Sequence, residues 1–295
     1  MKLKVLDLFS GIGGFSLGLE RTGGFETVAF CEIEEYPRRV LAKHWPKVPC
    51  YHDVRTLTAD TLARDGIAVD VICGGFPCQD ISFAGKGAGL AGERSGLWSE
   101  YARLIRELRP NFVIVENVAA LLSRGLADVL GCLAEIGYDA EWHCIPASAV
   151  GAPHRRDRLW IVAYPGGQQH EGNCAPIGRA LAAQLFAADA NCYGEHDGAI
   201  NAEMAVSSQS MADANRGNRH GRSCDVQVGR QRISRKTSQH DLIGRTEWLV
   251  EPDVGRVAHG VPARVDRLKG LGNAVVPHIP QLIGQAILES LKEAA

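Results

Sequence analysis

The chain has 295 residues, of which 45% are hydrophobic and 22% charged, with 32 basic against 34 acidic side chains. This apolar fraction supplies a buried core and excludes disordered and fibrous classes. The formal net charge of −2 does not indicate a nucleic-acid-binding protein, although a local basic patch is compatible with it. The sequence has neither a membrane-spanning apolar stretch nor a signal-peptide pattern in MKLKVLDLFSGIGG, so we expect a cytoplasmic protein.

The first 163 residues alternate short apolar runs with helical patterns. The apolar runs predict five strands, at residues 5–9, 27–31, 69–73, 112–116 and 159–163. Residues 99–108 predict a helix with one apolar face, which Pro110 terminates. This alternation is typical of an α/β fold whose mostly parallel sheet is covered on both faces. Ligands of such sheets bind at the carboxyl ends of the strands.

The composition changes after residue 163. Residues 165–247 are rich in Gly, Asn, Gln, Ser, His and Arg, and the sequence ADAN at 188–191 returns at 212–215. Between residues 216 and 236 there are seven basic residues and one acidic residue. Such a region is either a disordered linker or a small loop-rich domain with a basic surface, and its length favours a domain.

The last segment has the pattern of a helix. One face carries Ile279, Leu282, Ile283, Ala286, Ile287 and Leu291, with Ser290 as its polar member. We expect this face to pack on the predicted sheet.

The nine cysteines include no C-x-x-C pair, so we expect mostly free thiols. Cys192 and His196 stand four residues apart, but without paired spacing we interpret them as loop residues and expect no metal site.

A glycine-rich turn follows the first predicted strand. In DLFSGIGG, at 7–14, Gly11, Gly13 and Gly14 permit a tight turn that a ligand can approach closely, although Ser16 replaces the third glycine of the dinucleotide fingerprint. The turn alone is equally compatible with an ordinary loop. Glu32, at the end of the second predicted strand, adds an acidic side chain that can bind ribose hydroxyls. Together they predict a cofactor that contains a nucleoside.

Two further strands end in residues suited to catalysis. GGFPCQDIS, at 74–82, places Cys78 after a turn that Pro77 stiffens, where a thiolate can act as a nucleophile. Residues 80–96 contain five glycines and predict a mobile lid. In ENV, at 116–118, Glu116 is either a helix cap or a catalytic carboxylate, and we favour catalysis because it shares the predicted edge with Glu32 and Cys78.

A cluster of basic residues precedes the last predicted strand. HRRDR, at 154–158, is either a solvated charge run or the source of two arginines for one site. Alternate residues of a strand point to the same side, so Arg156 and Arg158 are the candidates.

These motifs, in this order, resemble those of the DNA (cytosine-5) methyltransferase family. DLFSGIGG resembles the cofactor loop, GGFPCQDIS the nucleophile motif, ENV the glutamate motif and HRRDR the Q-x-R-x-R motif. GLGNAVVP, at 270–277, resembles the last cofactor-side motif. The resemblance implies a Rossmann-like α/β fold of the S-adenosylmethionine-dependent type with a small target-recognition domain. The resemblance also implies that the protein methylates DNA as part of a restriction-modification system.

The resemblance implies a mechanism that passes through a covalent intermediate. Cys78 would attack C6 of a cytosine flipped out of duplex DNA, and Glu116 would bind the pyrimidine at N3 and its amino group. Arg156 and Arg158 would hold the adduct and the carboxylate, while Ser82 would close over the base.

The implied cofactor is S-adenosylmethionine, with S-adenosylhomocysteine as product. Phe9 would stack near the adenine, Glu32 would hold the ribose and Asp53 the adenine amine. The full set of implied cofactor residues is Phe9, Gly11, Gly13, Gly14, Glu32, Ile33, Asp53, Pro77, Leu97 and Asn273.

The implied organisation has three parts. Residues 1–163 form the catalytic and cofactor-binding domain, 164–256 the target-recognition domain, and 257–295 a segment that returns to the first. The chain departs from the family at His154, where glutamine is usual, and in the compressed segment 264–277, where the roles of Arg264 and Arg267 stay open. The compressed form is similar to prophage and small modification-system enzymes. We expect a monomer that binds duplex DNA and no membrane, with any cognate restriction endonuclease acting separately.

Three other functions compete with this one. An RNA methyltransferase acting on transfer RNA would use the same cysteine chemistry. A non-catalytic DNA-binding homologue is disfavoured because Cys78, Glu116 and both arginines are present. A nicotinamide-dependent dehydrogenase fits the glycine turn but has no need of GGFPCQ beside ENV.

Overall fold

A computed structural model describes residues 2–77, 96–166, 177–178, 181 and 264–293. Its strands are β1 (Leu3–Leu8), β2 (Phe25–Cys31), β3 (Cys50–Tyr51), β4 (Val71–Gly74), β5 (Phe112–Val118), β6 (Tyr138–Pro146) and β7 (Asp157–Pro165). Its helices are α1 (Gly14–Arg21), α2 (Glu35–His44), α3 (Ala59–Arg64), α4 (Gly96–Leu108), α5 (Leu121–Arg124), α6 (Leu126–Ile136), η3 (Ala147–Val150), α8 (Arg264–Asn273) and α9 (His278–Glu293). In this described part, no helix has both the length and the apolar character needed to cross a bilayer.

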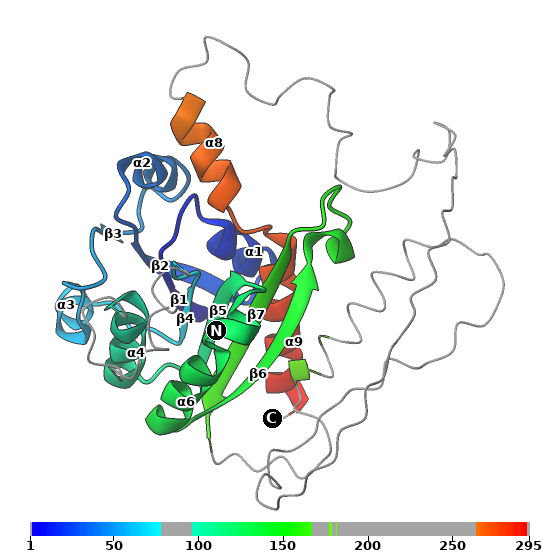
Figure 1. The fold of residues 1–295 in the computed structure, drawn as a ribbon. Helices are drawn as coiled ribbons and strands as arrows, with labels where there is room; N and C mark the ends of the chain where they lie inside the picture. The colour runs from blue at the N-terminus through cyan, green and yellow to red at the C-terminus, as the bar shows by residue number, and fades with distance from the viewer. Residues whose placement is uncertain (1, 78–95, 167–176, 179–180, 182–263, 294–295) are drawn as a thin grey trace, which may run out of the picture.

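One seven-stranded sheet, in the order β3-β2-β1-β4-β5-β7-β6, organises the fold (Figure 1). All five predicted strands are present, and the predicted mostly parallel α/β architecture is confirmed. β7 is the exception, since it runs antiparallel to both β5 and β6. Two strands were not predicted: β3, which has two residues, and β6, whose sequence YDAEWHCIP carries no continuous apolar run.

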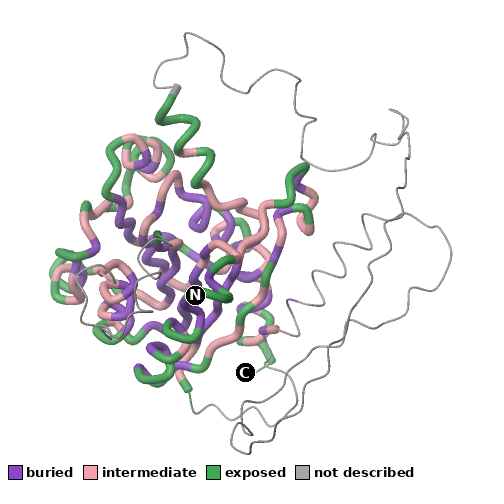
Figure 2. The backbone as a smooth tube through the Cα atoms, in the orientation of Figure 1, coloured by how far each residue is buried: buried purple, intermediate pink, exposed green. Residues whose placement is uncertain are grey.

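Helices cover both faces of the sheet, as its sequence pattern predicts. On β5, Val113 and Val115 face the cluster that contains α4 and α6, while Phe112 and Ile114 face the cluster that contains α1 and α9. This alternation follows from the pleat of a strand, whose successive side chains point to opposite faces. Figure 2 shows the resulting buried centre, within which each fully buried aliphatic side chain contributes about 1.5–3 kcal/mol.

The C-terminal helix α9 packs on the sheet, as its apolar face predicts. Ile279, Ile283 and Ile287 are buried in the same cluster as Phe15 and Leu19 of α1. Leu291, the last member of the predicted face, is 41% exposed because it lies beyond this cluster.

A short piece of the region after residue 163 also packs on the sheet. Ile177 and Leu181 are buried against Ile145 of β6 and Trp160 and Val162 of β7. The sheet therefore supports at least these two residues of the predicted target-recognition region.

Candidate active site

Glu116 and Arg158 meet at the carboxyl end of β5. The Nε atom of Arg158 lies 2.8 Å from Oε1 of Glu116, and only 15% of the Glu116 side chain is exposed. Burial raises the pKa of Glu116 above its ordinary value, while the positive charges of Arg158 and Arg156 act against that rise. Glu116 therefore presents a partly desolvated carboxyl group whose orientation Arg158 fixes.

The direction of β7 decides that these two side chains meet. Val118 pairs with Arg158 and Glu116 pairs with Trp160 in the antiparallel register. Because β7 runs against β5, its first residues lie beside the last residues of β5. A parallel β7 would have placed Arg158 at the opposite edge of the sheet.

Gly75 makes room for the Glu116 carboxyl group. A Cβ atom at position 75 would lie 2.6 Å from Oε2 of Glu116, closer than real Cβ contacts allow. The preceding Gly74 makes similar room for a main-chain atom, since its Cβ would lie 2.3 Å from the carbonyl oxygen of Leu8. The Gly–Gly pair of the sequence motif thus permits two different close approaches, one to a side chain and one to the main chain.

Asn117 fixes the main chain that leads to the predicted nucleophile. Its buried side chain donates a 2.9 Å hydrogen bond from Nδ2 to the carbonyl oxygen of Phe76, and its Oδ1 accepts one from the amide of Val118. Cys78 and Ser82 lie outside the described residues. Asn117 belongs to ENV but has no predicted role, although an amide next to a strand-end glutamate is a usable signal.

Arg156 binds the C-terminal segment. Its guanidinium donates hydrogen bonds of 2.7 and 2.8 Å to the carbonyl oxygens of Gly272 and Ala274. Its backbone φ is 38°, a conformation that non-glycine residues adopt mainly where the surroundings impose it. The structure therefore brings Arg158 to Glu116 by direct contact, and directs the Arg156 hydrogen bonds to the end of α8. His154 is exposed.

The glycine turn between β1 and α1 is closed by the acidic residue that the sequence singled out. Oε2 of Glu32 accepts a 2.8 Å hydrogen bond from the amide of Gly11, and Oε1 accepts one of 2.7 Å from the amide of Glu34. Glu32 is buried and follows β2 directly. A carboxylate offers about four acceptor positions, so two amide bonds leave capacity for ribose hydroxyls.

Two of the predicted cofactor glycines have packing roles. A Cβ at Gly13 would lie 2.6 Å from the Trp45 ring, and a Cβ at Gly14 would lie 2.6 Å from the carbonyl oxygen of Val275. Gly11, with φ of 53°, has no such neighbour and is positioned by Glu32. The turn thus contains two glycines that close packing requires and one, Gly11, with open space at its Cβ position.

The remaining predicted cofactor residues differ in exposure. The Phe9 ring stacks 6.3 Å from Tyr101, and Leu97 packs against the same core. Pro77 and Asn273 are exposed, and Ile33 is 53% exposed.

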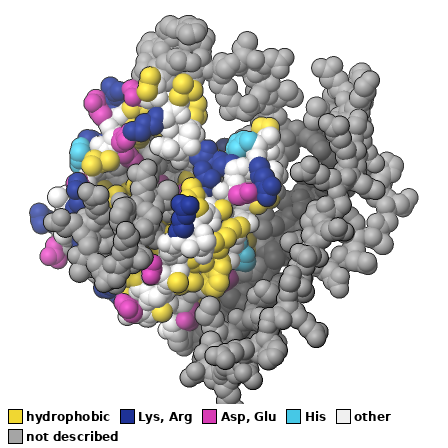
Figure 3. Space-filling model, viewed as in Figure 1, with side chains coloured by type: hydrophobic (Ala, Val, Ile, Leu, Met, Phe, Trp, Pro, Cys, Tyr) yellow, Lys and Arg dark blue, Asp and Glu magenta, His cyan; other side chains and the backbone are white. Residues whose placement is uncertain are grey.

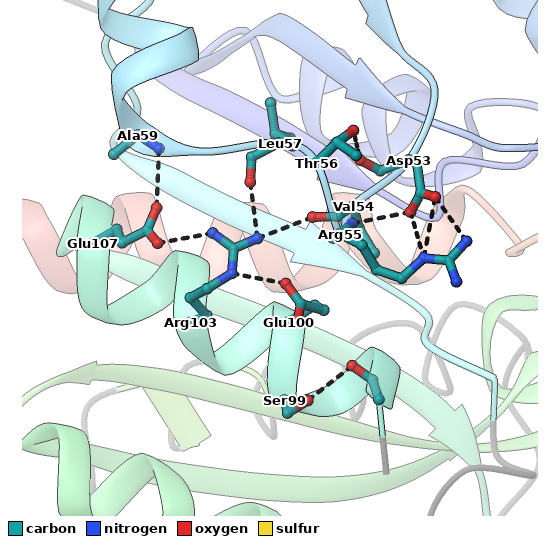
Figure 4. Close-up of polar contacts among 11 residues, drawn as sticks. Asp53, Val54, Arg55, Thr56, Leu57, Ala59, Ser99, Glu100, Arg103 and Glu107 are labelled. Carbon is teal, nitrogen blue, oxygen red and sulfur yellow. Dashed lines mark hydrogen bonds and ion pairs between the residues drawn. The ribbon is translucent and has the colours of Figure 1, made fainter. Parts of the chain in front are cut away.

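Asp53 lies just beyond β3, at the same edge as Glu32. The amide of Glu32 donates a 3.0 Å hydrogen bond to the carbonyl oxygen of Tyr51, which joins the ends of the two strands. Both oxygens of Asp53 accept hydrogen bonds from Arg55 (Figure 4), and these bonds lower the pKa of Asp53. An ionised carboxylate at this position is an acceptor for an amino group.

The side chains present at this edge fit a nucleoside. Glu32 offers acceptors for hydroxyl groups, Asp53 an acceptor for an amine, and Phe9 an aromatic surface. Figure 3 shows Lys and Arg side chains near the centre of the face in view, although the whole chain is nearly neutral. The fold and this edge together are those of an α/β protein that can bind a nucleoside.

A sequence profile described as C-5 cytosine-specific DNA methylase matches residues 3–220. The match covers well over half of the chain, so the protein belongs to this family. The family membership confirms the resemblance on which the motif assignments rest.

Curated relatives from different sources match part of the chain. The Type II methyltransferase M2.BsuMI of Bacillus subtilis is 35% identical over 55% of this chain and 42% of its own length. The Type II methyltransferase M.CviJI of Paramecium bursaria Chlorella virus IL3A is 36% identical over 55% of this chain and 43% of its own length. Among solved structures, a DNA modification methyltransferase encoded within an E. coli prophage is 29% identical with a TM-score of 0.47, covering 56% of this chain and 47% of the other. The match spans less than half the length of each of these proteins.

Proposed function

We propose that this protein methylates C5 of cytosine in a specific sequence of duplex DNA. The observation that carries the proposal is the partly buried Glu116–Arg158 pair beside the main chain that leads into GGFPC, in a member of this family. The relatives are named Type II methyltransferases, which supports a role in a restriction-modification system.

S-Adenosylmethionine is the proposed cofactor, and when bound it supplies the methyl group. Glu32 would bind its ribose hydroxyls, Asp53 its adenine amino group and Phe9 its adenine ring. The turn at Gly11 and the exposed residues Ile33 and Asn273 would complete the site, with Gly13, Gly14, Pro77 and Leu97 as its remaining proposed members.

Glu116 and Arg158 would bind the pyrimidine. Burial favours the neutral carboxylic acid of Glu116, which donates a hydrogen bond to N3 of cytosine through its proton and accepts one from the 4-amino group. Arg158 holds the carboxyl group in place through its Nε. The target base would have to leave the duplex to reach this partly buried pair, at a cost of a few kcal/mol.

Cys78 would act as the nucleophile. Its thiolate forms a bond to C6 of the cytosine, which makes C5 nucleophilic enough to accept the methyl group. Solvent would then take the C5 proton, its electron pair would form the C5–C6 double bond, and the Cys78 sulfur would leave as thiolate, which restores the aromatic ring. Ser82 would close over the base from the same motif.

The proposed division of labour follows the three parts of the chain. Residues 1–163 would carry cofactor binding and catalysis, 164–256 would read the DNA sequence, and 257–295 would return to the first domain. The packing of α9 on the sheet supports the last assignment. We propose a monomer, with any partner endonuclease acting separately.

The experiment is tritium transfer from S-adenosylmethionine to duplex DNA and, in parallel, to transfer RNA. We expect label in DNA, and we expect Cys78→Ser to abolish it while DNA and S-adenosylhomocysteine still bind. Cys144→Ser, a change at an exposed thiol on β6, is the matched control and should retain activity. Label in RNA alone would overturn the substrate, and methylation by the Cys78 variant would overturn the covalent mechanism.

A further inference from the structure

The Asp53 carboxylate stands on a tight turn. The amide of Arg55 donates to Oδ1 of Asp53 at 3.0 Å, and the amides of Thr56 and Leu57 donate to the Asp53 carbonyl oxygen. The Arg55 side chain, 62% exposed, closes the turn from outside through a 2.7 Å contact between its Nη2 and Oδ2 of Asp53. These contacts are local, so they shape the turn but do not fix it to the rest of the molecule.

Arg103 of α4 fixes the turn to the core. Its Nη2 donates hydrogen bonds of 3.0 Å to the carbonyl oxygen of Val54 and 2.8 Å to that of Leu57, so that one nitrogen spans the turn (Figure 4). Val54 and Leu57 are themselves buried against the α4 side of the sheet. The guanidinium therefore binds the main chain on both sides of Arg55 and immediately after Asp53.

Two carboxylates on α4 hold the Arg103 fork in this orientation. Glu100 accepts from its Nε at 2.7 Å and Glu107 from its Nη1 at 2.8 Å. Glu107 also accepts a 3.0 Å hydrogen bond from the amide of Ala59, the first residue of α3. Charge-assisted bonds with fixed planar geometry restrict rotation more than a single ammonium contact does. The segment 54–59 is thus held at three main-chain atoms by one arginine and its partner.

We propose that Arg103 is a positioning residue for the adenine of S-adenosylmethionine. Arg103 fixes the position of the turn from which Asp53 accepts a hydrogen bond from the 6-amino group. The proposal rests on the proposed function, since it requires an adenosine-containing donor. Through this contact, Arg103 would determine the preference of the site for a 6-amino over a 6-oxo purine. A carboxylate accepts a hydrogen bond from the amine and faces an oxygen in the 6-oxo analogue, so small displacements of Asp53 should reduce the preference.

The test is calorimetric binding of S-adenosylhomocysteine and its 6-oxo analogue, S-inosylhomocysteine, to the full chain without DNA. In Arg103→Lys the positive charge stays but the fork is lost. We expect affinity for the adenosyl ligand to fall about tenfold, with a smaller loss for the inosyl ligand, so that the ratio of the two affinities shrinks. Arg106→Lys is the matched control: Arg106 is an exposed residue of the same helix whose side chain contacts Cys132, and both affinities should stay unchanged.

Each outcome separates this proposal from the proposed function. If the parent protein prefers the adenosyl ligand and Arg103→Lys shows the same preference, the positioning role is overturned and the proposed function stands. Equal binding of both ligands by the parent would show that Asp53 does not meet the 6-amino group, which also overturns it. Binding of neither ligand by the parent would overturn the proposed donor itself. A purely structural role would lower thermal stability without changing the ratio.

A second variant covers the case in which Arg103→Lys does not fold. Glu107→Gln keeps an oxygen for the amide of Ala59 and weakens the Arg103 pair. We expect it to change the ligand ratio in the same direction and by less. An unchanged ratio in a folded Glu107→Gln protein would count against the proposal.

Discussion

At the scale of single residues, the orientation of the Glu116 carboxyl group depends on the absence of a Cβ atom at Gly75. The Cβ of any other residue at position 75 would lie 2.6 Å from Oε2 of Glu116, while Arg158 holds the other oxygen at 2.8 Å. The carboxyl group can turn away from a new methyl group, because it is the end of a flexible side chain. It would then leave the orientation in which Arg158 holds it.

Gly75→Ala should therefore reduce catalysis more than stability. We expect kcat for DNA methylation to fall by tenfold or more, since a small misplacement of a catalytic group is costly, and the melting temperature to change little. Steady-state kinetics and thermal unfolding of the same preparation would measure both.

Gly131→Ala is the matched control for the glycine substitution. Gly131 lies in α6 with open space around its Cβ position, so alanine should stabilise the helix by up to about 1 kcal/mol and leave kcat unchanged. If Gly75→Ala kept full kcat, the close approach would have no bearing on the reaction.

At the scale of elements, Arg156 links two segments that are distant in the sequence. It stands just before β7 and binds the carbonyl oxygens of Gly272 and Ala274, on either side of Asn273. A cation near the end of a helix also interacts favourably with its exposed carbonyl groups. The start of β7 thus sets the position of the end of α8, which carries part of GLGNAVVP, including the proposed cofactor residue Asn273.

Arg156→Lys should weaken cofactor binding. A lysine has no planar fork with which to reach both carbonyl oxygens, so the segment around Asn273 would lose its anchor. We expect KM for S-adenosylmethionine to rise severalfold with a smaller change in kcat, measured by methyl transfer at saturating DNA.

Arg155→Lys provides the control at the adjacent position. The Arg155 side chain is 82% exposed and pairs with Asp157, so both constants should stay at the parent values. A lower kcat with an unchanged KM in Arg156→Lys would instead place Arg156 on the reacting base, as the family resemblance implied.

At the scale of the whole molecule, a buried acid contributes to the pH dependence of folding. Asp7 of β1 is fully buried, and its Oδ2 accepts a 2.7 Å hydrogen bond from Ser16 of α1. Burial raises the pKa of Asp7 from 3.8 to about 8. The folded state then binds a proton that the unfolded state releases, between about pH 4 and pH 8, so stability falls as the pH rises through that window.

Asp7→Asn should remove this part of the pH dependence. We expect the parent protein to lose on the order of a few kcal/mol of unfolding free energy between pH 5 and pH 8, relative to the asparagine variant. Urea unfolding at several pH values would measure the difference, with Glu26→Gln, a change at an exposed residue of β2, as the control. Parallel pH profiles of the parent and Asp7→Asn would contradict the raised pKa.

Much of the fold and part of the site follow from local sequence pattern. Residues that are close together in the chain predict the five strands and the apolar face of α9. They also place Glu32 and Glu116 at the ends of strands. β3 and β6 escaped prediction because one is too short to show a pattern and the other mixes polar and apolar residues. Arg103 gave no signal, since its partners at Val54 and Leu57 are far away in the sequence.

The sequence by itself determined which chemical groups this protein possesses: a cysteine after a Gly–Gly–Phe–Pro turn, a strand-end glutamate, and two arginines spaced for one side of a strand. Only the tertiary structure decided which of the two arginines forms the ion pair with Glu116. Antiparallel pairing of β7 with β5 brings Arg158 to Glu116, while the positive φ at Arg156 accompanies its contact with the end of α8. Strand direction and long-range contacts arise from packing of the whole sheet, and that packing is not encoded in any one motif.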